Sequence, residues 1–438
     1  MEYLTLGDLA RRVDEEKNPG NQTVFVRVDT NTTLIDGTFG SNERIRHAGV
    51  TIRRLIDMGL KVVIGTHNGR RGEPDFISLG PLQDMLSVIV GKIMYIGNTY
   101  DDDGLNQRAI DRINSLAPRQ AFLLENLRFL PGEEVRMSPE DHSKTRFIKQ
   151  LIEDCHVEYF VNDAFSTCHR NHRSIVGFVD IPNIAGLTTD AELKSAELVF
   201  EHFSSKISSR LNVYLLGGVK VSDYFELMEN SLADKNVDKV LCAGAFGNLC
   251  LFAKGYDLGE VSRRFLETNG LWEFLKRVKD LMGRYPSVLE VPVDVATIQN
   301  EQRKEYDVDN IPKEVKQRYQ ALDIGGRTAE KFINIIDKAK LVFVKGPIGA
   351  FDKNGLLNRG CFLILQKLTD GDFSSRCFTV LAGGDTSVML EYLSVDRTMI
   401  NHVSLAGGAL LMLYARAELP GITQLNKSYQ KFSKMFLR

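Results

Sequence analysis

Strand-like and helix-like patterns alternate along the chain from Thr23 onward. This alternation is typical of parallel βαβ units and excludes an all-α or an all-β fold. In the first half, the sequence predicts strands at residues 23–28, 61–65, 93–96, 121–124 and 158–161. In the second half, it predicts strands at residues 212–216, 239–243, 288–291, 341–344 and 378–381. Helical patterns lie between strands, for example at residues 44–58, 81–90 and 139–155.

The length of 438 residues is too great for one ordinary domain, so we expect two. The predicted fold is α/β, with two Rossmann-like parallel-sheet domains, a hinge helix and a deep cleft between the domains. The hinge helix is predicted at 188–206, where a polar helical pattern opens with the capping-type start TTDAEL. It separates an N-terminal domain at 1–187 from a C-terminal domain at 207–422. The basic tail at 423–438 is either loose or packed on the first domain.

The composition narrows the function classes. Hydrophobic residues make up 43% and charged residues 26%, as in ordinary soluble proteins. The net charge of −2 disfavours a general nucleic-acid or membrane surface, and no apolar run reaches membrane-spanning length. None of the six cysteines forms a C-x-x-C pair, which favours reduced thiols. No stretch at the start has the pattern of a signal peptide. We expect a cytoplasmic protein with no nucleic-acid or membrane partner.

Cationic residues follow the predicted strands of the first half. In an open parallel sheet, ligands gather at the carboxyl ends of the strands. The polar and charged residues near those ends are Arg27, Asp29, Asn31, Arg44, His67, Arg70, Arg71, Arg128, His169, Arg170, His172 and Arg173. A single arginine is more often a solvated surface charge, and a single histidine is as often structural. Guanidinium groups from several loops, however, suit a small ligand with phosphate and carboxylate groups. Asp29 and Asn31 add groups that can bond a hydroxyl.

Small, glycine-rich loops follow the predicted strands of the second half. They contain Gly217, Gly218 and Lys220; Gly244; Pro347 and Asp352; and Gly383, Gly384, Asp385 and Thr386. Paired glycines between a strand and a helix leave backbone N–H groups that suit phosphate. Asp385 either caps the helix that follows or holds a hard cation such as Mg²⁺. Each loop alone is an ordinary turn, but together they predict a mononucleotide site. Neither the P-loop nor the dinucleotide-binding fingerprint is present.

With these motifs in this order, the chain resembles the phosphoglycerate kinase family over nearly its whole length. In the first half the family motifs appear as RVDTN from Arg27, THNGR from Thr66, ENLRF from Glu125 and NDAFSTCHRNHRS from Asn162. In the second half they appear as GGVKVSDY from Gly217, KGPIGAFD from Lys345, AGGDTS from Ala382, HVSLAGGA from His402 and LPGI from Leu419. The second half is more similar to archaeal members than to bacterial or eukaryotic ones.

The resemblance implies where each ligand binds. It places 3-phosphoglycerate or 1,3-bisphosphoglycerate at Arg27, Asp29, Asn31, Arg44, His67, Arg70, Arg128 and Arg170. It places ADP or ATP with Mg²⁺ at Gly217, Gly218, Lys220, Gly244, Lys345, Pro347, Asp352, Gly383, Gly384, Asp385 and Thr386. Within this set, Lys220 lies near the phosphates, Asp352 at the ribose and Asp385 at the metal. We expect a monomer, with a dimer as the alternative.

The reaction implied by the resemblance is in-line phosphoryl transfer between an acyl phosphate and ADP after hinge closure. The attacking carboxylate is already ionised, so no general base is needed. Catalysis then depends on positioning and on neutralising the transferred group. The resemblance assigns that neutralisation to Mg²⁺, to Arg44 and Lys220, and to N–H groups at two glycine pairs, Gly383-Gly384 and Gly407-Gly408.

The chain departs from the family pattern in its nucleotide half. Tyr224 replaces a lysine, Lys345 replaces an asparagine, Ala382 and Ala406 replace glycines, and Asp352 replaces a glutamate. Lys345 either compensates for the cation lost at position 224 or points to solvent. The alanines matter only if their positions need a positive φ. Two other hypotheses stay open. One is a paralogous kinase for a related phosphorylated acid, and the other is a weakly catalytic, nucleotide-binding regulatory protein.

Overall fold

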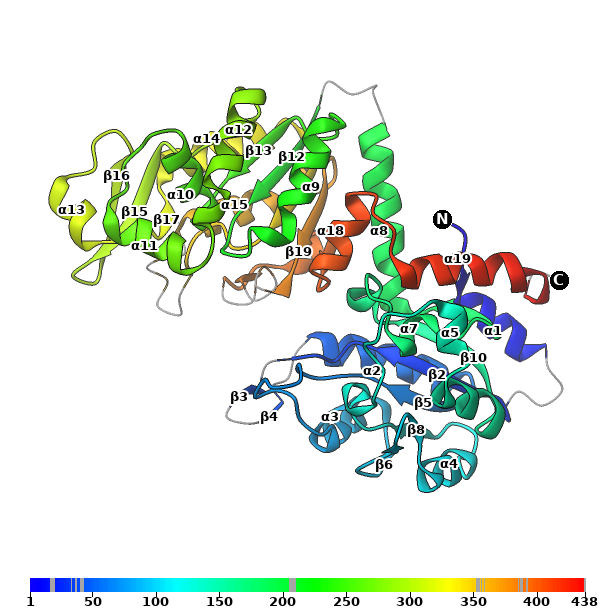
Figure 1. Cartoon of the computed structure of the whole chain (residues 1–438). Helices are drawn as coiled ribbons and strands as arrows, with labels where there is room; N and C mark the ends of the chain where they lie inside the picture. Colours follow the sequence, from blue (N-terminus) through cyan, green and yellow to red (C-terminus); the bar gives the residue numbers. More distant parts are fainter. Residues whose placement is uncertain are drawn as a thin grey trace. The chain divides into compact units, whose positions relative to one another are not determined.

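The computed structural model describes residues 1–15, 20–32, 34–35, 38–39, 43–204, 210–351, 355, 357, 359–384, 386, 389–390 and 393–436 of the chain. The chain forms two compact units (Figure 1). The first contains Met1–Lys194 and Ala417–Arg438, and the second contains Ser195–Arg416. The chain therefore passes from one unit to the other twice. Within the described ranges, no helix is both long enough and apolar enough to span a bilayer.

The first unit is built on a seven-stranded sheet in which every neighbouring pair is parallel. In spatial order its strands are β1 (Leu4–Thr5), β11 (Asn183–Ala185), β10 (Val157–Asp163), β2 (Thr23–Val28), β5 (Lys61–Gly65), β9 (Ala121–Leu123) and β6 (Ile93–Tyr95). β2 and β5 begin and end at the predicted residues, and the other predicted strands of this half differ by one or two residues at an end.

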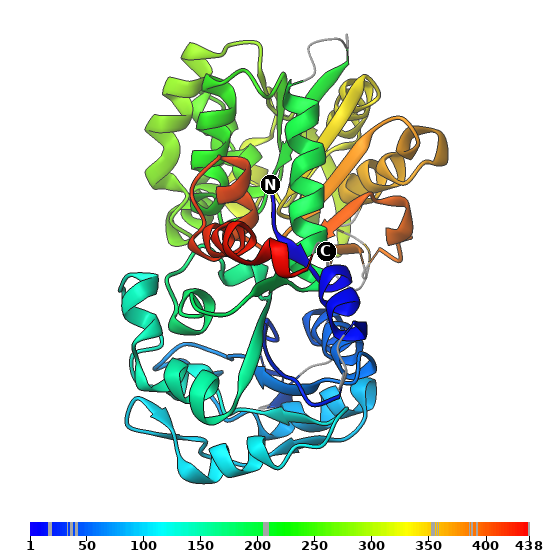
Figure 2. The same cartoon turned by 90° about the vertical axis from the view of Figure 1, so that its right-hand side faces the viewer.

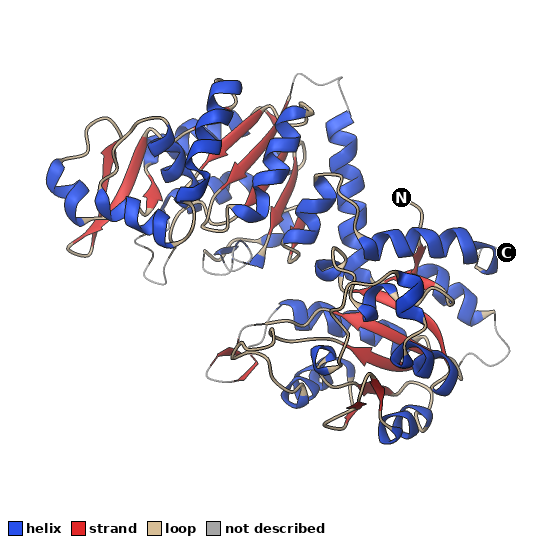
Figure 3. Cartoon of the chain, viewed as in Figure 1, coloured by secondary structure: helices blue, strands red, loops and turns tan. Residues whose placement is uncertain are grey.

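Helices lie on both faces of this sheet (Figure 3). They are α1 (Leu6–Asp14), α2 (Glu43–Asp57), α3 (Gly80–Val90), α4 (Gln107–Asn114), α5 (Pro139–Ser143), α6 (Arg146–Lys149) and α7 (Arg173–Val176). Side chains alternate along a strand, so β2 contributes to two cores. Val24 and Val26 pack in the core that includes α2 and α3, and Phe25 packs in the core that includes α4 and α6. A strand buried on both faces explains why the apolar runs are continuous.

Three features of the first unit differ from the prediction. The helix expected at 139–155 is broken into α5, α6 and a π-helical turn at Gln150–Asp154, because Thr145 between the first two has extended backbone. Two short hairpins were not predicted: β3 (Leu34–Ile35) with β4 (Thr38–Phe39), and β7 (Tyr100–Asp101) with β8 (Gly104–Leu105).

The C-terminal helix α19 (Pro420–Phe432) belongs to the first unit, where it packs against β1, β11 and α7 (Figures 1 and 2). Ser428 Oγ accepts a 2.7 Å hydrogen bond from the Asn183 backbone N–H. The N–H of Gly421 donates to the carbonyl of Cys168 at 2.9 Å. The basic tail, for which the sequence left two possibilities, therefore belongs to this unit in its described part.

The second unit contains a six-stranded parallel sheet and a separate three-stranded antiparallel sheet. The parallel strands in spatial order are β14 (Leu289–Glu290), β13 (Lys239–Cys242), β12 (Leu211–Leu216), β18 (Ala339–Lys345), β19 (Phe378–Ala382) and β20 (His402–Ser404). The antiparallel strands are β16 (Gln302–Asp307), β15 (Asp294–Gln299) and β17 (Asp323–Ile324), which the sequence did not predict.

Helices accompany these sheets in alternation with the parallel strands (Figure 3). They are α9 (Ser222–Ala233), α10 (Gly244–Ala253), α11 (Glu260–Thr268), α12 (Leu275–Arg284), α13 (Lys313–Arg318), α14 (Gly326–Ile336), α15 (Arg359–Leu368), α16 (Gly371–Ser374) and α18 (Gly408–Tyr414). The predicted fold class, α/β with two Rossmann-like parallel-sheet domains, is confirmed.

Helix α8 (Leu187–Ser204) passes from the first unit into the second. It begins at Leu187, just before the predicted start at residue 188. The N–H groups of its first turn donate hydrogen bonds to a side chain from another element. Asp163, the last residue of β10, accepts hydrogen bonds from the N–H of Thr188 at 2.7 Å and of Thr189 at 3.2 Å. A carboxylate at a helix N-terminus satisfies unpaired donors and complements the helix dipole. Burial raises the pKa of Asp163 to about 6.

We expect Asp163→Ala to destabilise the first unit by about 2 kcal/mol, because it leaves buried N–H groups at the start of α8 without an acceptor. Urea unfolding followed by circular dichroism measures this loss. Asp163→Asn keeps a side-chain oxygen in the same place, so it should cost clearly less. Equal unfolding midpoints for Asp163→Ala and the unmodified chain would contradict the role of this cap.

Candidate active site

The cationic residues of the first unit lie at one edge of its sheet. β10, β2, β5 and β9 are adjacent and parallel, so the segments that follow them meet at their carboxyl ends. Arg27 lies within β2, and His67 and Arg128 follow β5 and β9. The positive charges of Arg27, Arg128 and Arg170 all lower the pKa of His67. The residues predicted from separate loops therefore form one electrostatic cluster.

Arg27 is fully buried, and the chain holds its guanidinium from three sides. Nε donates to Ser174 Oγ at 3.0 Å, Nη1 donates to the Val28 carbonyl at 2.5 Å, and Nη2 lies 2.9 Å from His67 Nδ1. Burial lowers the pKa of Arg27 from its ordinary value, but an arginine this basic stays charged. Arg27 is predicted to bind the substrate. Its contact with His67 gives it a second role, which is to orient the imidazole ring.

His67 is held in one protonation state. Burial, followed by the neighbouring arginines, lowers the pKa of His67 well below its ordinary value, so the ring is neutral near pH 7. An arginine can only donate, so Nδ1 of His67 is the acceptor of the bond from Arg27. The ring proton therefore resides on Nε2. His67 presents a hydrogen-bond donor, which suits a ligand oxygen.

Asp29 and Asn31 position neighbouring groups. Asp29 Oδ2 lies 2.5 Å from Arg44 Nη1 and also accepts a bond from the Ser166 hydroxyl. Asp29 Oδ1 accepts from the N–H of Asn31 at 3.0 Å, and Asn31 Oδ1 accepts from the N–H of Gly69 at 2.9 Å. These contacts orient the Arg44 guanidinium and the loop that carries Arg70.

The remaining arginines differ in exposure. Arg128 is buried, with Nε 2.9 Å from Glu134 Oε1 and Nη1 donating to the Gly69 carbonyl. Arg170 is half-buried, and its Nε donates to His169 Nε2 at 3.1 Å. Arg70 is exposed. The cluster thus extends from a buried charge at Arg27 to a solvent-facing charge at Arg70.

A buried carboxylate that sequence reasoning missed supports this cluster. Glu133 accepts from the Ser174 hydroxyl at 2.6 Å and from the Ser174 N–H at 3.1 Å. Since Ser174 Oγ also accepts from Arg27 Nε, the serine links the two charged groups. Burial raises the pKa of Glu133 to about 7, although Arg27 acts in the opposite direction. Its one signal in the sequence is its position four residues after the end of the ENLRF motif.

We expect Glu133 to shape the pH dependence of stability. A carboxyl group whose folded pKa is raised from 4.5 to about 7 adds stability that is complete below pH 4.5 and lost as the pH rises through 7. At most about 3 kcal/mol is involved, at 1.36 kcal/mol per unit. Glu133→Gln should therefore remove part of the fall in unfolding free energy between pH 4.5 and 7. The matched control is Glu134→Gln, at a half-exposed neighbour. Equal pH slopes for the unmodified chain and Glu133→Gln would refute the prediction.

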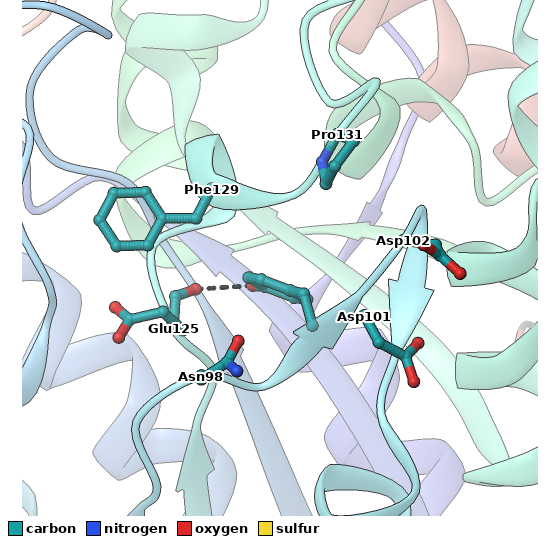
Figure 4. A pocket seen from close by; sticks show the side chains of 7 residues that line it. Asn98, Asp101, Asp102, Glu125, Phe129 and Pro131 are labelled. Carbon is teal, nitrogen blue, oxygen red and sulfur yellow. Dashed lines mark hydrogen bonds between the residues drawn. The ribbon is translucent and has the colours of Figure 1, made fainter.

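Another pocket of the first unit, of about 490 Å³, is lined by Glu125 and Phe129 (Figure 4) and also by Tyr100. The Tyr100 hydroxyl donates to the Glu125 carbonyl at 2.6 Å, which is the dashed line in Figure 4. The carboxylate of Glu125 is bonded elsewhere, to Ser78 Oγ and to the N–H of Leu79. Of the described residues that line this pocket, none belongs to the predicted substrate set.

The second unit has a small, mostly apolar pocket of about 210 Å³ where its glycine loops meet. Its lining residues are Gly218, Val219, Gly244, Ala245, Asn248, Phe265, Gln320, Ala321, Leu322, Pro347, Gly349 and Ala350. Gly218 follows β12, Gly244 follows β13 and Pro347 follows β18, and these strands are neighbours in the parallel sheet. Three of the predicted nucleotide loops are therefore adjacent.

The approach of these loops requires residues without side chains. A Cβ atom at Gly217 would lie 2.3 Å from the Pro347 carbonyl oxygen, closer than any real contact. The Gly217 N–H also donates to the Lys345 carbonyl at 2.9 Å. The predicted role of glycine here, close packing of backbone on backbone, therefore has a direct geometric cause.

Tyr224 is a core residue. Its side chain is 1% exposed, its ring packs edge-on against Phe246 with centroids 5.6 Å apart, and its hydroxyl donates to the Gly217 carbonyl at 3.1 Å. The tyrosine therefore supports the glycine loop from beneath. Lys220, in contrast, is exposed.

Lys345 is buried beside the glycine turn after β19. The side chain is 6% exposed, which excludes the interpretation that it points to solvent. A Cβ atom at Gly383 would lie 2.6 Å from Lys345 Nζ, and the φ of +100° at Gly383 also demands glycine. Thr386 Oγ1, in the same turn, accepts from the Gly346 N–H at 3.2 Å and donates to the Ala382 carbonyl at 2.9 Å. The ammonium group is thus packed against this turn.

Open space lies next to the two glycine turns of the second unit. A Cβ atom at Gly384, Gly407 or Gly408 would meet no atom of the described residues within 4 Å. The turns are close together because β19 and β20 are parallel neighbours, with Ala382 paired to Ser404. Neither Ala382 nor Ala406 has a positive φ, so the alanines cause no backbone strain. Asp352 and Asp385, the predicted ribose and metal residues, lie outside the described residues.

Comparisons with known proteins identify the family of this chain. The sequence profile of the family described as Phosphoglycerate kinase matches residues 15–415. The chain belongs to the phosphoglycerate kinase family. It is 35% identical over 423 residues to the phosphoglycerate kinase of Pyrococcus horikoshii, covering 96% of this chain and 98% of that protein. The phosphoglycerate kinase of Thermococcus kodakarensis is 34% identical over 412 residues, covering 94% of this chain and 96% of that one.

Solved structures lead to the same family. The crystal structure of phosphoglycerate kinase from Pyrococcus horikoshii superposes with a TM-score of 0.85 at 33% identity, covering 98% of this chain and 100% of that chain. The structure of phosphoglycerate kinase from Coxiella burnetii has a TM-score of 0.69 at 24% identity, covering 97% of this chain and 99% of that one, and shows the shared fold. As members of this family are phosphotransferases with a carboxyl acceptor, the predicted family and enzyme class are confirmed.

Tyr224 permits a direct test of the departure from the family pattern. Tyr224→Phe removes one hydrogen bond and should cost about 1 kcal/mol of stability. Tyr224→Lys restores the family residue but buries an ammonium group in a core of aromatic rings, so it should cost several kcal/mol. Urea unfolding and the KM for ATP are measured for both. If Tyr224→Lys were as stable as the unmodified chain and bound ATP more tightly, the assignment of Tyr224 to the core would be wrong.

Proposed function

We propose that this chain catalyses reversible phosphoryl transfer between 1,3-bisphosphoglycerate and ADP, yielding 3-phosphoglycerate and ATP. The observation that carries the proposal is the buried network of Arg27, His67, Ser174 and Glu133 at the edge of the first sheet. It holds a guanidinium and a neutral imidazole donor in fixed positions. These groups, with Arg44, Arg128 and Arg170, suit a small acid that carries phosphate and carboxylate groups. Asp29 and Asn31 belong to the same proposed site.

We place the nucleotide on the second unit. The base occupies the pocket between Gly244, Phe265, Leu322 and Pro347, where small and apolar groups suit a flat ring. The phosphates extend toward Lys220, Lys345 and the glycine turns that include Gly384 and Gly407. These turns combine backbone N–H groups with open space, which suits anionic oxygens.

We assign a magnesium ion to the nucleotide phosphates and Asp385. Among the described residues, no group of three or more histidine, cysteine, aspartate or glutamate side chains could hold a metal by itself. A donor set of one carboxylate with substrate phosphates is the kind that Mg²⁺ commonly uses. When bound, the ion neutralises phosphate charge. Asp352 is assigned to the ribose hydroxyls.

Charge and position, rather than proton transfer, account for the proposed catalysis. The attacking carboxylate is ionised near pH 7, and His67 is neutral and acts as a donor. Arg44, oriented by Asp29, supplies positive charge from the first unit, and Lys220 with the glycine N–H groups supplies it from the second. Because the two sets of residues are on separate units, transfer requires a closed state. We assign the hinge to α8 and to the crossing after Arg416.

Two alternatives are testable, and the second of them is from a different functional class. A paralogous kinase would use a different phosphorylated acid, but the complete arginine set favours a phosphoglycerate. A weakly catalytic regulatory protein was suggested mainly by Tyr224 and the two alanines. Ala382 and Ala406 have no positive φ, so they give this alternative no support through backbone strain. We further propose a cytoplasmic protein, since all six cysteines are free and buried, which suits a reducing compartment. A monomer, with a dimer as the alternative, stays our prediction for the oligomeric state.

We expect the purified chain, with Mg²⁺, to convert 3-phosphoglycerate and ATP into 1,3-bisphosphoglycerate and ADP, with the ADP measured by a coupled assay. Turnover with another phosphorylated acid only would establish the paralogous kinase. Nucleotide binding without turnover of any such acid would establish the regulatory protein.

Lys345→Asn should raise the KM for ATP about tenfold or more and leave the KM for 3-phosphoglycerate within about twofold, because a charge-assisted contact to phosphate is lost. The matched control is Lys340→Asn, at the other end of β18, where Nζ donates to the His202 carbonyl at 3.0 Å. It should change neither KM. An unchanged KM for ATP in Lys345→Asn would end this assignment.

A further inference from the structure

A buried ion pair lies behind the pocket of the second unit. Asp323, in β17, has a fully buried side chain, and its Oδ2 lies 2.9 Å from Arg303 Nη1 in β16. Arg303 also donates from Nη2 to the Ile324 carbonyl at 2.8 Å, so it contacts both the carboxylate and the backbone of β17. Both residues belong to the antiparallel sheet, which carries no predicted site residue.

The same carboxylate joins two further segments. Asp323 Oδ2 accepts from the N–H of Gly360 in the first turn of α15 at 3.0 Å. A Cβ atom at Gly349 would lie 2.1 Å from Asp323 Oδ1. The backbone of the loop after β18 therefore packs directly against the carboxylate. That loop is also tied to the segment before Asp323, because the Ala350 N–H donates to the Leu322 carbonyl at 2.7 Å.

These contacts meet at the wall of the pocket. Leu322, Gly349 and Ala350 all line it, and each is adjacent to Asp323 in sequence or in space. The loop that contains Gly349 and Ala350 continues to Asp352. A buried ion pair adds little net stability compared with apolar packing, but it restricts which arrangement of the chain is favourable. Here the restricted element is one wall of the pocket.

We propose that Asp323, held by Arg303, is a positioning residue for the nucleotide. It fixes the wall formed by Leu322, Gly349 and Ala350 at the distance that accepts the flat base. The proposal rests on the placement of the nucleotide in this pocket. It predicts a defect that is specific for the nucleotide, since Asp323 and the residues that it positions all belong to the second unit.

The test is steady-state kinetics of Asp323→Asn and Arg303→Met, with ADP binding measured by calorimetry. Asp323→Asn keeps the size of the side chain and removes its charge, and Arg303→Met removes the partner. Each should raise the KM for ATP and the Kd for ADP about tenfold and leave the KM for 3-phosphoglycerate within twofold. In the double variant the defects should be less than multiplicative, because both substitutions break one pair.

Asp294→Asn is the matched control. Asp294 is a second buried aspartate of the same unit, and it accepts from the Thr328 N–H at 2.8 Å and the Arg327 N–H at 3.0 Å at the start of α14. It does not line the pocket. The control should lower the urea unfolding midpoint and leave the KM for ATP unchanged. All variants are assayed well below their unfolding temperatures.

Three results would overturn the proposal. One is an unchanged Kd for ADP in a folded Asp323→Asn or Arg303→Met chain. The second is an equal rise in Kd for Asp294→Asn, which would show a general effect of instability. The third is an equal rise in the KM for both substrates. Failure of the proposed function would look different, since the unmodified chain would then bind no ADP or turn over no 3-phosphoglycerate. If Asp323→Asn does not fold, Arg303→Met and the conservative Arg303→Lys decide the question.

Discussion

Parallel pairing of strands is the constraint on which both candidate sites depend. In each main sheet the carboxyl ends of neighbouring strands lie at one edge, so residues far apart in sequence meet there. The pairing also buries both faces of the central strands, and Phe25 and Val26 of β2 accordingly pack in different cores. Polar groups on such a strand have room only at its end. Arg27 is near that end, where the sheet gives way to loops that can supply acceptors.

In the proposed sites, the two units offer anions different kinds of partner. The first unit uses side-chain cations, and each buried one has an acceptor: Arg27 donates to Ser174, and Arg128 to the Gly69 carbonyl. A buried guanidinium without such bonds would cost several kcal/mol. The second unit uses mainly backbone N–H groups at turns that include Gly384 and Gly407, where side chains are absent and space is open. The side-chain cations need neighbouring residues that accept their hydrogen bonds, whereas the backbone turns need residues with small side chains.

The sequence predicted those parts of the structure that depend on neighbours in the chain. Continuous apolar runs located β2 and β5, because a doubly buried strand has no other pattern. The strand QRKEYD of β16 was missed because its side chains are charged and partly exposed, so that only pairing with β15 makes it a strand. Glu133 and Asp323 were missed for a related reason. Their partners are 41 and 20 residues away, and no local pattern indicates such a pair.

Tyr224 shows what a motif comparison leaves out. Aligned against a lysine, it looked like a cation lost from the nucleotide site. In the folded chain, the Tyr224 side chain is buried beneath Gly217, and its hydroxyl donates to the carbonyl of that residue. Lys345 instead extends from the end of β18 to the turn at Gly383. The strand fixes its backbone, and the surrounding residues fix its side chain. An ammonium group held in this way loses less conformational entropy on binding phosphate than one on a flexible surface side chain.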